Sequence, residues 1–154
     1  MLETPHVVVA AALALKIANP ALAIPIALGS HFVLEKVPHW NPHLNSEMKK
    51  FGKISPTSTK IVFIDSFLAL SLGTIIAATT LPNLSRFITI MICCLFSVLP
   101  DLIEAPYYFL KSKSPFLIKK WIPFQKSIQS DASPFFGIVT QVLIIFTSLM
   151  WILN

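Results

Sequence analysis

The chain has 154 residues, of which 55% are hydrophobic and 12% are charged. Ordinary soluble domains carry about 25% charged residues. This composition, with a mean hydropathy of +0.73, therefore excludes an ordinary soluble globular protein. Because the length is near that of one domain, we expect residues 1–154 to form a single integral membrane domain.

Two short apolar runs open the chain, over residues 5–17 and 20–37. The first is about 20 Å long as a helix, whereas the hydrocarbon core of a bilayer is about 30 Å thick. Asn19 is a suitable N-cap and Pro20 a favoured first helical residue. The two runs are therefore predicted to form a tight helical hairpin, either re-entrant or short and tilted.

Three longer apolar runs follow, over residues 61–80, 84–110 and 134–153, and each is long enough to span a membrane. Residues 38–60 and 111–132 are polar and are predicted to be loops. The second loop contains a short amphipathic piece, FLIKKWIPF, suited to the membrane surface. The predicted fold class is all-α, a polytopic membrane helical bundle with a short N-terminal helical hairpin and three transmembrane helices.

The basic residues indicate an orientation. Five lysines lie in or beside residues 38–60 and five more in residues 111–132, whereas the turn between the first two spans contains only Arg86. The positive-inside bias places both basic loops in the cytoplasm, so we expect a multi-pass protein of the cytoplasmic (inner) membrane. Contact with anionic lipids of the bilayer accounts for the net charge of +5 without nucleic acid. The sequence identifies no protein partner.

Ionisable residues from four separate segments are expected at one depth, in the inner third of the bilayer. They are His6, His31, Glu35, Asp65, Asp101 and Glu104. A charge near hydrocarbon is costly and is expected to face a partner or a wet cavity. A shared cation would convert the mutual repulsion of the carboxylates into coordination, and imidazole with carboxylate suits zinc, iron or manganese.

Most of these residues, and two further histidines, also have a simpler interpretation. His6, His39 and His43 can be interfacial residues, the latter two beside Trp40. His31 can form a hydrogen bond to a neighbouring helix, and Glu35 can pair with Lys36. Glu104 can cap a helix or pair with a loop lysine. Asp101 is the hardest to interpret in this way, because Pro100 removes a helical hydrogen bond to Phe96 and opens the helix beside the acid.

Three short motifs carry a resemblance: TPH near the start, SHFVLEKVPHW at 30–40, and LPDLIE in a later span. In this order they resemble the small bacterial membrane-bound metal-dependent hydrolase family, over roughly residues 4–40 and 98–130. The resemblance implies His6, His31 and Asp101 as metal ligands, with His39 and Glu104 as further ligands or supports. The family's late histidine motif is absent, since residues 124–130 read FQKSIQS and no histidine follows His43.

The predicted function is metal-dependent hydrolysis at the cytoplasmic membrane face, on a phosphate ester or a lipid. The cofactor would be a divalent metal, zinc or manganese, and Glu104 or Asp65 would take the proton of the attacking water. Lys126 and Lys111 would hold phosphate, and Gln125 would bind water or a ligand oxygen. The alternatives are a noncatalytic membrane protein with a structural, metal-binding or lipid-binding polar cluster, and a small ion or metal transporter.

Overall fold

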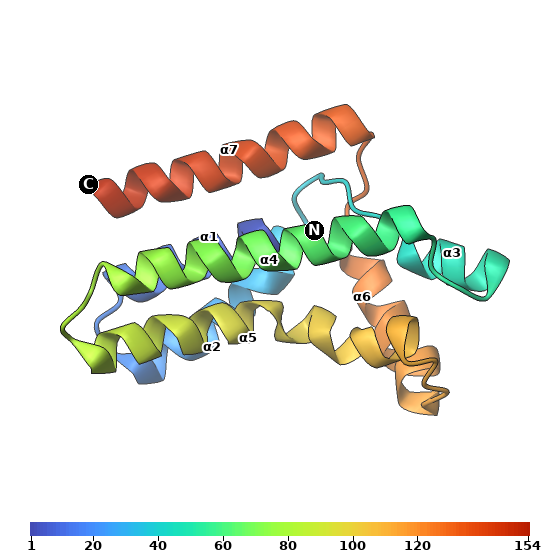
Figure 1. Ribbon diagram of the computed structural model, residues 1–154, viewed down its shortest axis with the longest axis horizontal. Helices are drawn as coiled ribbons and strands as arrows, with labels where there is room; N and C mark the ends of the chain where they lie inside the picture. Colours follow the sequence, from blue (N-terminus) through green and yellow to red (C-terminus); the bar gives the residue numbers. More distant parts are fainter.

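The structure, a computed structural model that describes residues 1–154, consists of helices and the segments that connect them. The elements in chain order are α1 (Glu3–Lys16), α2 (Pro20–Leu34), α3 (Leu44–Phe51), α4 (Pro56–Ala78), α5 (Leu84–Phe109), the π-helical turn η1 (Leu117–Trp121), α6 (Ile122–Ile128) and α7 (Pro134–Leu153). This confirms the all-α bundle with a short N-terminal hairpin (Figure 1).

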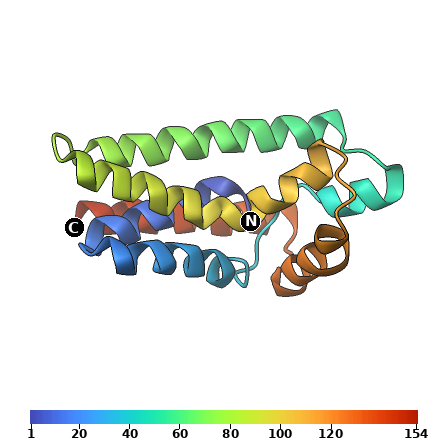
Figure 2. The same ribbon diagram turned by 90° about the horizontal axis from the view of Figure 1, so that it is seen from below.

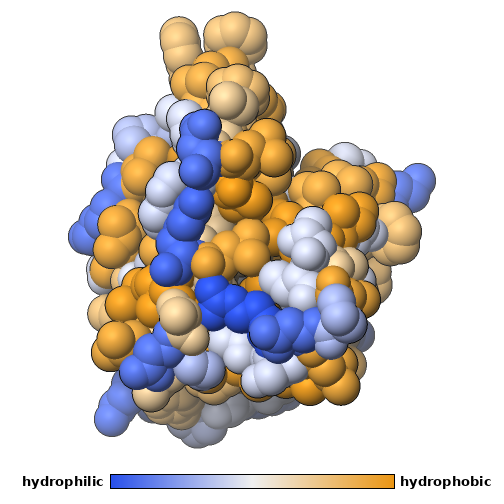
Figure 3. Space-filling model, turned by 90° about the vertical axis from the view of Figure 1, so that its left-hand side faces the viewer, coloured by the Kyte–Doolittle hydropathy of each residue, from blue (hydrophilic) through white to orange (hydrophobic).

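Three helices are long and apolar enough to cross a membrane: α4 with 23 residues, α5 with 26 and α7 with 20. Their outward faces carry large exposed apolar side chains, such as Phe67 at 69% exposure and Phe135 at 73%. Such apolar faces are suited to lipid and not to water. At the end of the molecule that carries the α1–α2 and α4–α5 turns, hydrophilic residues form a band and several separate patches among apolar ones (Figure 3).

Helix α1 lies at the centre of the bundle, where it packs against α2, α4, α5 and α7 (Figures 1 and 2). Small residues line these contacts, and the buried core is rich in alanine. At Gly73 of α4 an added Cβ would lie 2.9 Å from the side chain of Val7. Small residues let membrane helices approach closely, which explains why so short a helix can be surrounded on all sides.

Both ends of α1 are held by side chains of the long helices. At its C-terminus the Arg86 guanidinium donates to the carbonyl oxygens of Leu15 (2.6 Å) and Ile17 (3.0 Å). At its N-terminus the Asp65 carboxylate accepts from the backbone amides of Glu3 and Thr4 and from the Thr4 hydroxyl. Asp65 lies nine residues after Pro56, the first residue of α4, so α1 begins about 14 Å along the axis of α4 from its N-terminus.

The polar segments contain more helix than the sequence predicts. Residues 38–60, predicted as a loop, include α3, and residues 111–132 include η1 and α6. The helix breakers of the first segment flank α3 and do not interrupt it, because Pro42 precedes it and Gly52 ends it with φ of 66°. Helix α4 begins at Pro56, five residues earlier than predicted, where Ser55 caps it and proline is the first helical residue.

The cap at Asp65 predicts a stability effect. In Asp65→Ala the buried amides at the start of α1 lose their acceptor, so we expect the free energy of unfolding to fall by about 1–3 kcal/mol. Thermal unfolding in mild detergent measures the change, with the adjacent Ser66→Ala as control. Equal melting temperatures for the two variants would contradict a capping role.

Candidate metal centre

Four ionisable side chains converge near the start of α1. They are His6 from α1, His31 from α2, Glu35 at the end of α2 and Asp101 from α5. One ligating atom from each lies within 4.8 Å of the others, which is close enough for a shared metal ion. The two histidines are fully buried, with stacked rings whose centroids are 4.4 Å apart.

The hydrogen bonds of His31 define which ring nitrogen faces this group. Its Nδ1 lies 2.8 Å from the carbonyl oxygen of Ser97, an acceptor only, so Nδ1–H is the donor. In the neutral ring Nε2 then carries an unshared electron pair, directed toward Asp101 Oδ1 at 3.9 Å. Metal-bound histidines are held in this way, with the second nitrogen donating to a carbonyl.

The Nε2 atom of a neutral His39 ring carries a second unshared electron pair. Its Nδ1 donates to the carbonyl oxygen of Val37 at 2.8 Å, and burial lowers the pKa of His39, which favours the neutral ring. Its Nε2 then faces Glu35 Oε2 at 3.6 Å, and both atoms are buried without a hydrogen-bond partner. A metal ion between these two atoms, or a proton on the His39 ring, would satisfy both of them.

The other oxygen of Glu35 has partners. Glu35 Oε1 accepts from the Met1 ammonium and lies 3.2 Å from His6 Nε2. Glu35 itself is only 1% exposed. One carboxylate therefore connects the start of α1, His6 and the segment after α2.

Backbone pairing between two connecting segments holds Glu35 and His39 in place. The Ser130 amide donates to the Glu35 carbonyl at 3.0 Å, and the His39 amide donates to the Ser130 carbonyl at 3.0 Å. The Ala132 amide then donates to the His39 carbonyl at 2.8 Å. This isolated bridge directs the His39 ring inward even though the residue lies outside any helix.

Helix α7 supports the same segment from the other side. Gln141 donates to the Trp40 carbonyl at 2.8 Å and accepts from the Leu2 amide at 2.9 Å. At Gly137 an added Cβ would lie 2.3 Å from the Trp40 amide nitrogen. The absence of a side chain at Gly137 allows the segment that carries His39 to lie directly against α7.

Gln125 of α6 completes the wall beside His31. Its side-chain Nε2 donates to His31 Nε2 at 3.2 Å and to Asp101 Oδ1 at 3.4 Å, and its Oε1 is buried without a partner. The structure thus places Gln125, predicted to bind substrate, against two of the four central residues.

The other predicted site residues lie around this centre. Asp65 caps α1, and both of its carboxylate oxygens are hydrogen-bonded there. Glu104 accepts from the Tyr108 hydroxyl at 3.1 Å and keeps one buried oxygen without a partner. Lys126 is bound to Asp131 at 2.6 Å, and His43 is exposed outside the group.

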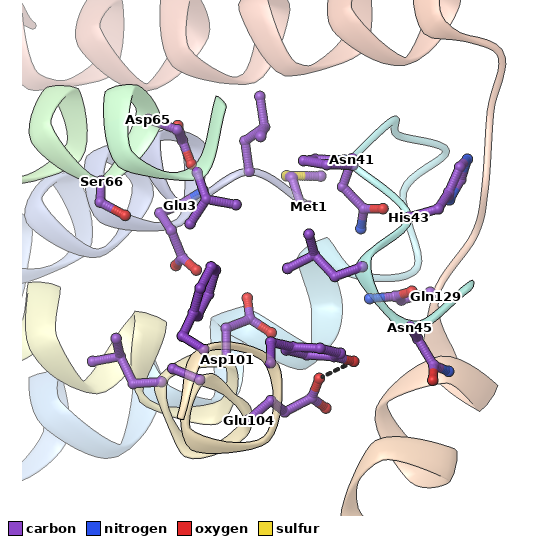
Figure 4. A pocket seen from close by; sticks show the side chains of 18 of the residues that line it. Met1, Glu3, Asn41, His43, Asn45, Asp65, Ser66, Asp101, Glu104 and Gln129 are labelled. Carbon is purple, nitrogen blue, oxygen red and sulfur yellow. Dashed lines mark hydrogen bonds between the residues drawn. The ribbon is translucent and has the colours of Figure 1, made fainter. Parts of the chain in front are cut away.

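A cavity of about 390 Å³ lies next to the four residues (Figure 4). Asp101 belongs to both, because its carboxylate reaches His31 on one side and lines the cavity on the other. Glu3 and Glu104 project into the same space from α1 and α5. A ligand in the cavity would therefore contact a residue of the candidate metal centre.

Glu35 is the main residue that sequence reasoning undervalued, since its expected partner Lys36 is exposed and the carboxylate turns inward. The four-residue spacing of His31 and Glu35, which puts both on one helix face, was the available signal. Gln141 was also overlooked, although an amide in an apolar span is itself a sign of a buried partner.

Comparison of the chain with protein-family models, with curated proteins and with solved structures finds no match. The resemblance carried by TPH and LPDLIE therefore remains a prediction, and the geometry of the centre carries the functional argument.

The packing at Gly137 predicts an effect on the centre. In Gly137→Ala the new Cβ would overlap the Trp40 backbone, so we expect a loss of about 1–3 kcal/mol in stability and displacement of His39. Thermal unfolding measures the loss. The control is Gly29→Ala, where nothing lies within 4 Å and alanine favours the helix. Equal or higher stability of Gly137→Ala relative to wild type would contradict this packing.

Proposed function

We propose that the chain is a membrane-embedded metal-dependent hydrolase that acts on an ester, such as a phosphate-ester lipid, at the cytoplasmic membrane face. The proposal depends mainly on one observation: two imidazoles and two carboxylates, three of them buried, have ligating atoms within 4.8 Å of one another. The order of the TPH, SHFVLEKVPHW and LPDLIE motifs supports it.

The residues fit a divalent cation. His31 presents an unshared pair because its other nitrogen donates to Ser97, and Glu35 Oε2 and His39 Nε2 are buried acceptors without donors. Two histidines with two carboxylates suit zinc or manganese. His6, His31, Glu35 and Asp101 would hold the ion, with His39 beside Glu35 as a further ligand or support.

Hydrolysis needs a water molecule whose pKa is lowered and a base that takes its proton. A bound divalent ion supplies a Lewis acid that makes water acidic near neutral pH. Glu104 lines the cavity, as Asp65 does, but one of its oxygens has no partner, whereas both oxygens of Asp65 cap α1, so Glu104 is the better candidate for the base. Glu104 would take one proton from water as the water oxygen bonds to the ester centre, and would return that proton to the leaving oxygen.

The charge distribution supports the proposed orientation. Ten lysines lie in or beside the segments that connect the helices at the α3 and α6 end, whereas Lys16 and Arg86 lie at the other end (Figure 1). The positive-inside bias would place the α3 and α6 end, and with it the cavity, on the cytoplasmic side of a bacterial inner membrane. Anionic lipids would contact these lysines.

A noncatalytic role is the second candidate, and the Met1 ammonium favours it. This group pairs with Glu35 within the polar cluster, so part of the charge there is compensated by the chain itself. Gln125 likewise satisfies the unshared pair of His31. On this alternative the polar cluster holds α1, α2, α5 and α6 together without a cation.

Metal content separates the two candidates. Elemental analysis of the purified protein in mild detergent is expected to show about one equivalent of zinc or manganese, reduced to background in His31→Ala and Asp101→Ala. His43→Ala is the matched control, because His43 is exposed and lies outside the group of four, and it is expected to retain the metal. A metal-free wild type, even after reconstitution, would refute the hydrolase and favour the structural role.

Glu104→Gln tests the assigned base. Removing a general base lowers turnover by about 10²- to 10⁴-fold, so phosphate release from phosphate-ester lipids is expected to fall by that factor while metal content stays unchanged. If turnover persists in Glu104→Gln and disappears in Asp65→Asn, with both proteins folded and metal-loaded, the base is Asp65 instead.

A further inference from the structure

The lining of the 390 Å³ cavity is strongly acidic. Four carboxylates line it, from Glu3, Asp65, Asp101 and Glu104, against a single lysine, Lys126. That lysine is already paired with Asp131, and the hydrogen bond between them lowers the pKa of Asp131. Carboxyl groups therefore outnumber basic side chains in the lining of the cavity, although the protein as a whole is basic.

Two of these carboxylates have a buried oxygen without a partner. They are Glu3 Oε2 and Glu104 Oε1, and the Glu104 residue is only 9% exposed. Neither belongs to the close group of four that suits a single metal ion. Each of these oxygens can accept a hydrogen bond from a ligand, and a protonated amine supplies both donors and a charge opposite to that of a carboxylate.

An apolar groove continues from the cavity. It has a volume of about 550 Å³, lies between α4 and α5, and shares Glu3, Ser66 and Leu102 with the cavity. It extends along α5 to Phe87, fifteen residues from Leu102, which corresponds to about 22 Å of helix. This is the length of a long fatty-acyl chain.

The groove faces the lipid side of the bundle. Leu70 of α4 and Leu95 of α5 line it and are 62% and 50% exposed. An acyl chain could therefore enter laterally from the bilayer and would find no polar side chain between Leu70 and Leu95. The groove and the cavity form one amphipathic site, apolar along α4 and α5 and acidic where it reaches Asp101.

We propose that this site binds a membrane phospholipid whose head group carries a protonated amine, with one acyl chain in the α4–α5 groove and the ammonium at Glu3, which leaves Glu104 free to act as the base. The inference rests on the proposed function in one respect, that the phosphate ester of this lipid would then lie next to Asp101 and the metal centre. Such a lipid is zwitterionic, and it fits the site better than an anionic one. Lys126 is bound to Asp131 and is not free to neutralise a second anionic group.

The test compares two lipids with identical acyl chains. The full-length protein is reconstituted in bilayers of equal parts phosphatidylethanolamine and phosphatidylglycerol, and the retained lipid is identified by native mass spectrometry. Charge-assisted hydrogen bonds predict about tenfold enrichment of phosphatidylethanolamine. Glu3→Gln is expected to abolish the enrichment. Equal retention of both lipids by the wild type would overturn the proposal.

The groove is tested by filling it. Leu95→Trp and Leu70→Trp, on the two facing helices, are each expected to reduce total retained phospholipid several-fold. Leu143→Trp on α7 is the matched control, since Leu143 is 54% exposed and does not line the groove. Unchanged retention in both groove variants, with the fold verified by circular dichroism, would overturn the assignment of the acyl chain.

Metal analysis on the same samples separates this inference from the proposed function. His31 does not line the cavity, so His31→Ala is expected to lose the metal and keep the preference for phosphatidylethanolamine. A metal-loaded wild type without lipid preference overturns the inference and leaves the hydrolase standing. A metal-free wild type that retains the preference overturns the hydrolase alone.

Discussion

The Glu35 carboxylate is the group around which the polar interior is arranged. It ends α2 at 1% exposure, and burying an unpaired carboxylate is far more costly than any single hydrogen bond can offset. The Met1 ammonium and His6 pair with its Oε1, whereas its Oε2 faces His39 and has no hydrogen-bond partner. The start of α1 and the segment after α2 must therefore meet at this point, whether or not a cation joins them.

The short length of the hairpin explains why this polar centre lies inside the bundle. A helix of 14 residues covers about 21 Å, so α1 ends within the length of its longer neighbours. Helix ends carry unpaired backbone groups that hydrocarbon does not tolerate. Asp65 satisfies the N-terminal end of α1 and Arg86 its C-terminal end, and His6, Glu35 and Asp101 lie together near the N-terminal end.

Hydropathy along the chain predicts the three spans well, because long apolar runs are visible in one dimension. Depth arguments also predict that His6, His31 and Asp101 lie at one level, where the structure groups them. Depth alone could not predict that Asp65 caps α1, because the sequence does not say which helix packs beside the start of α1. His39 depends on backbone pairing with residues 130–132, and this pairing between connecting segments has no periodic signal. The helix α3 was missed because prolines that flank a helix and prolines that break one look alike in sequence.

The amide of Gln125 lies where the two functional interpretations differ most. Its Nε2 donates to the same unshared pair of His31 that a metal ion would use, so the amide in this orientation and the ion exclude each other. Rotation of the amide by half a turn would present its unpartnered Oε1 to that space instead, and an amide oxygen is a suitable ligand for a hard cation. The centre is thus compatible with two states, one closed by Gln125 and one open to a cation. In the closed state three buried acceptors have no partner, namely Gln125 Oε1, Glu35 Oε2 and His39 Nε2.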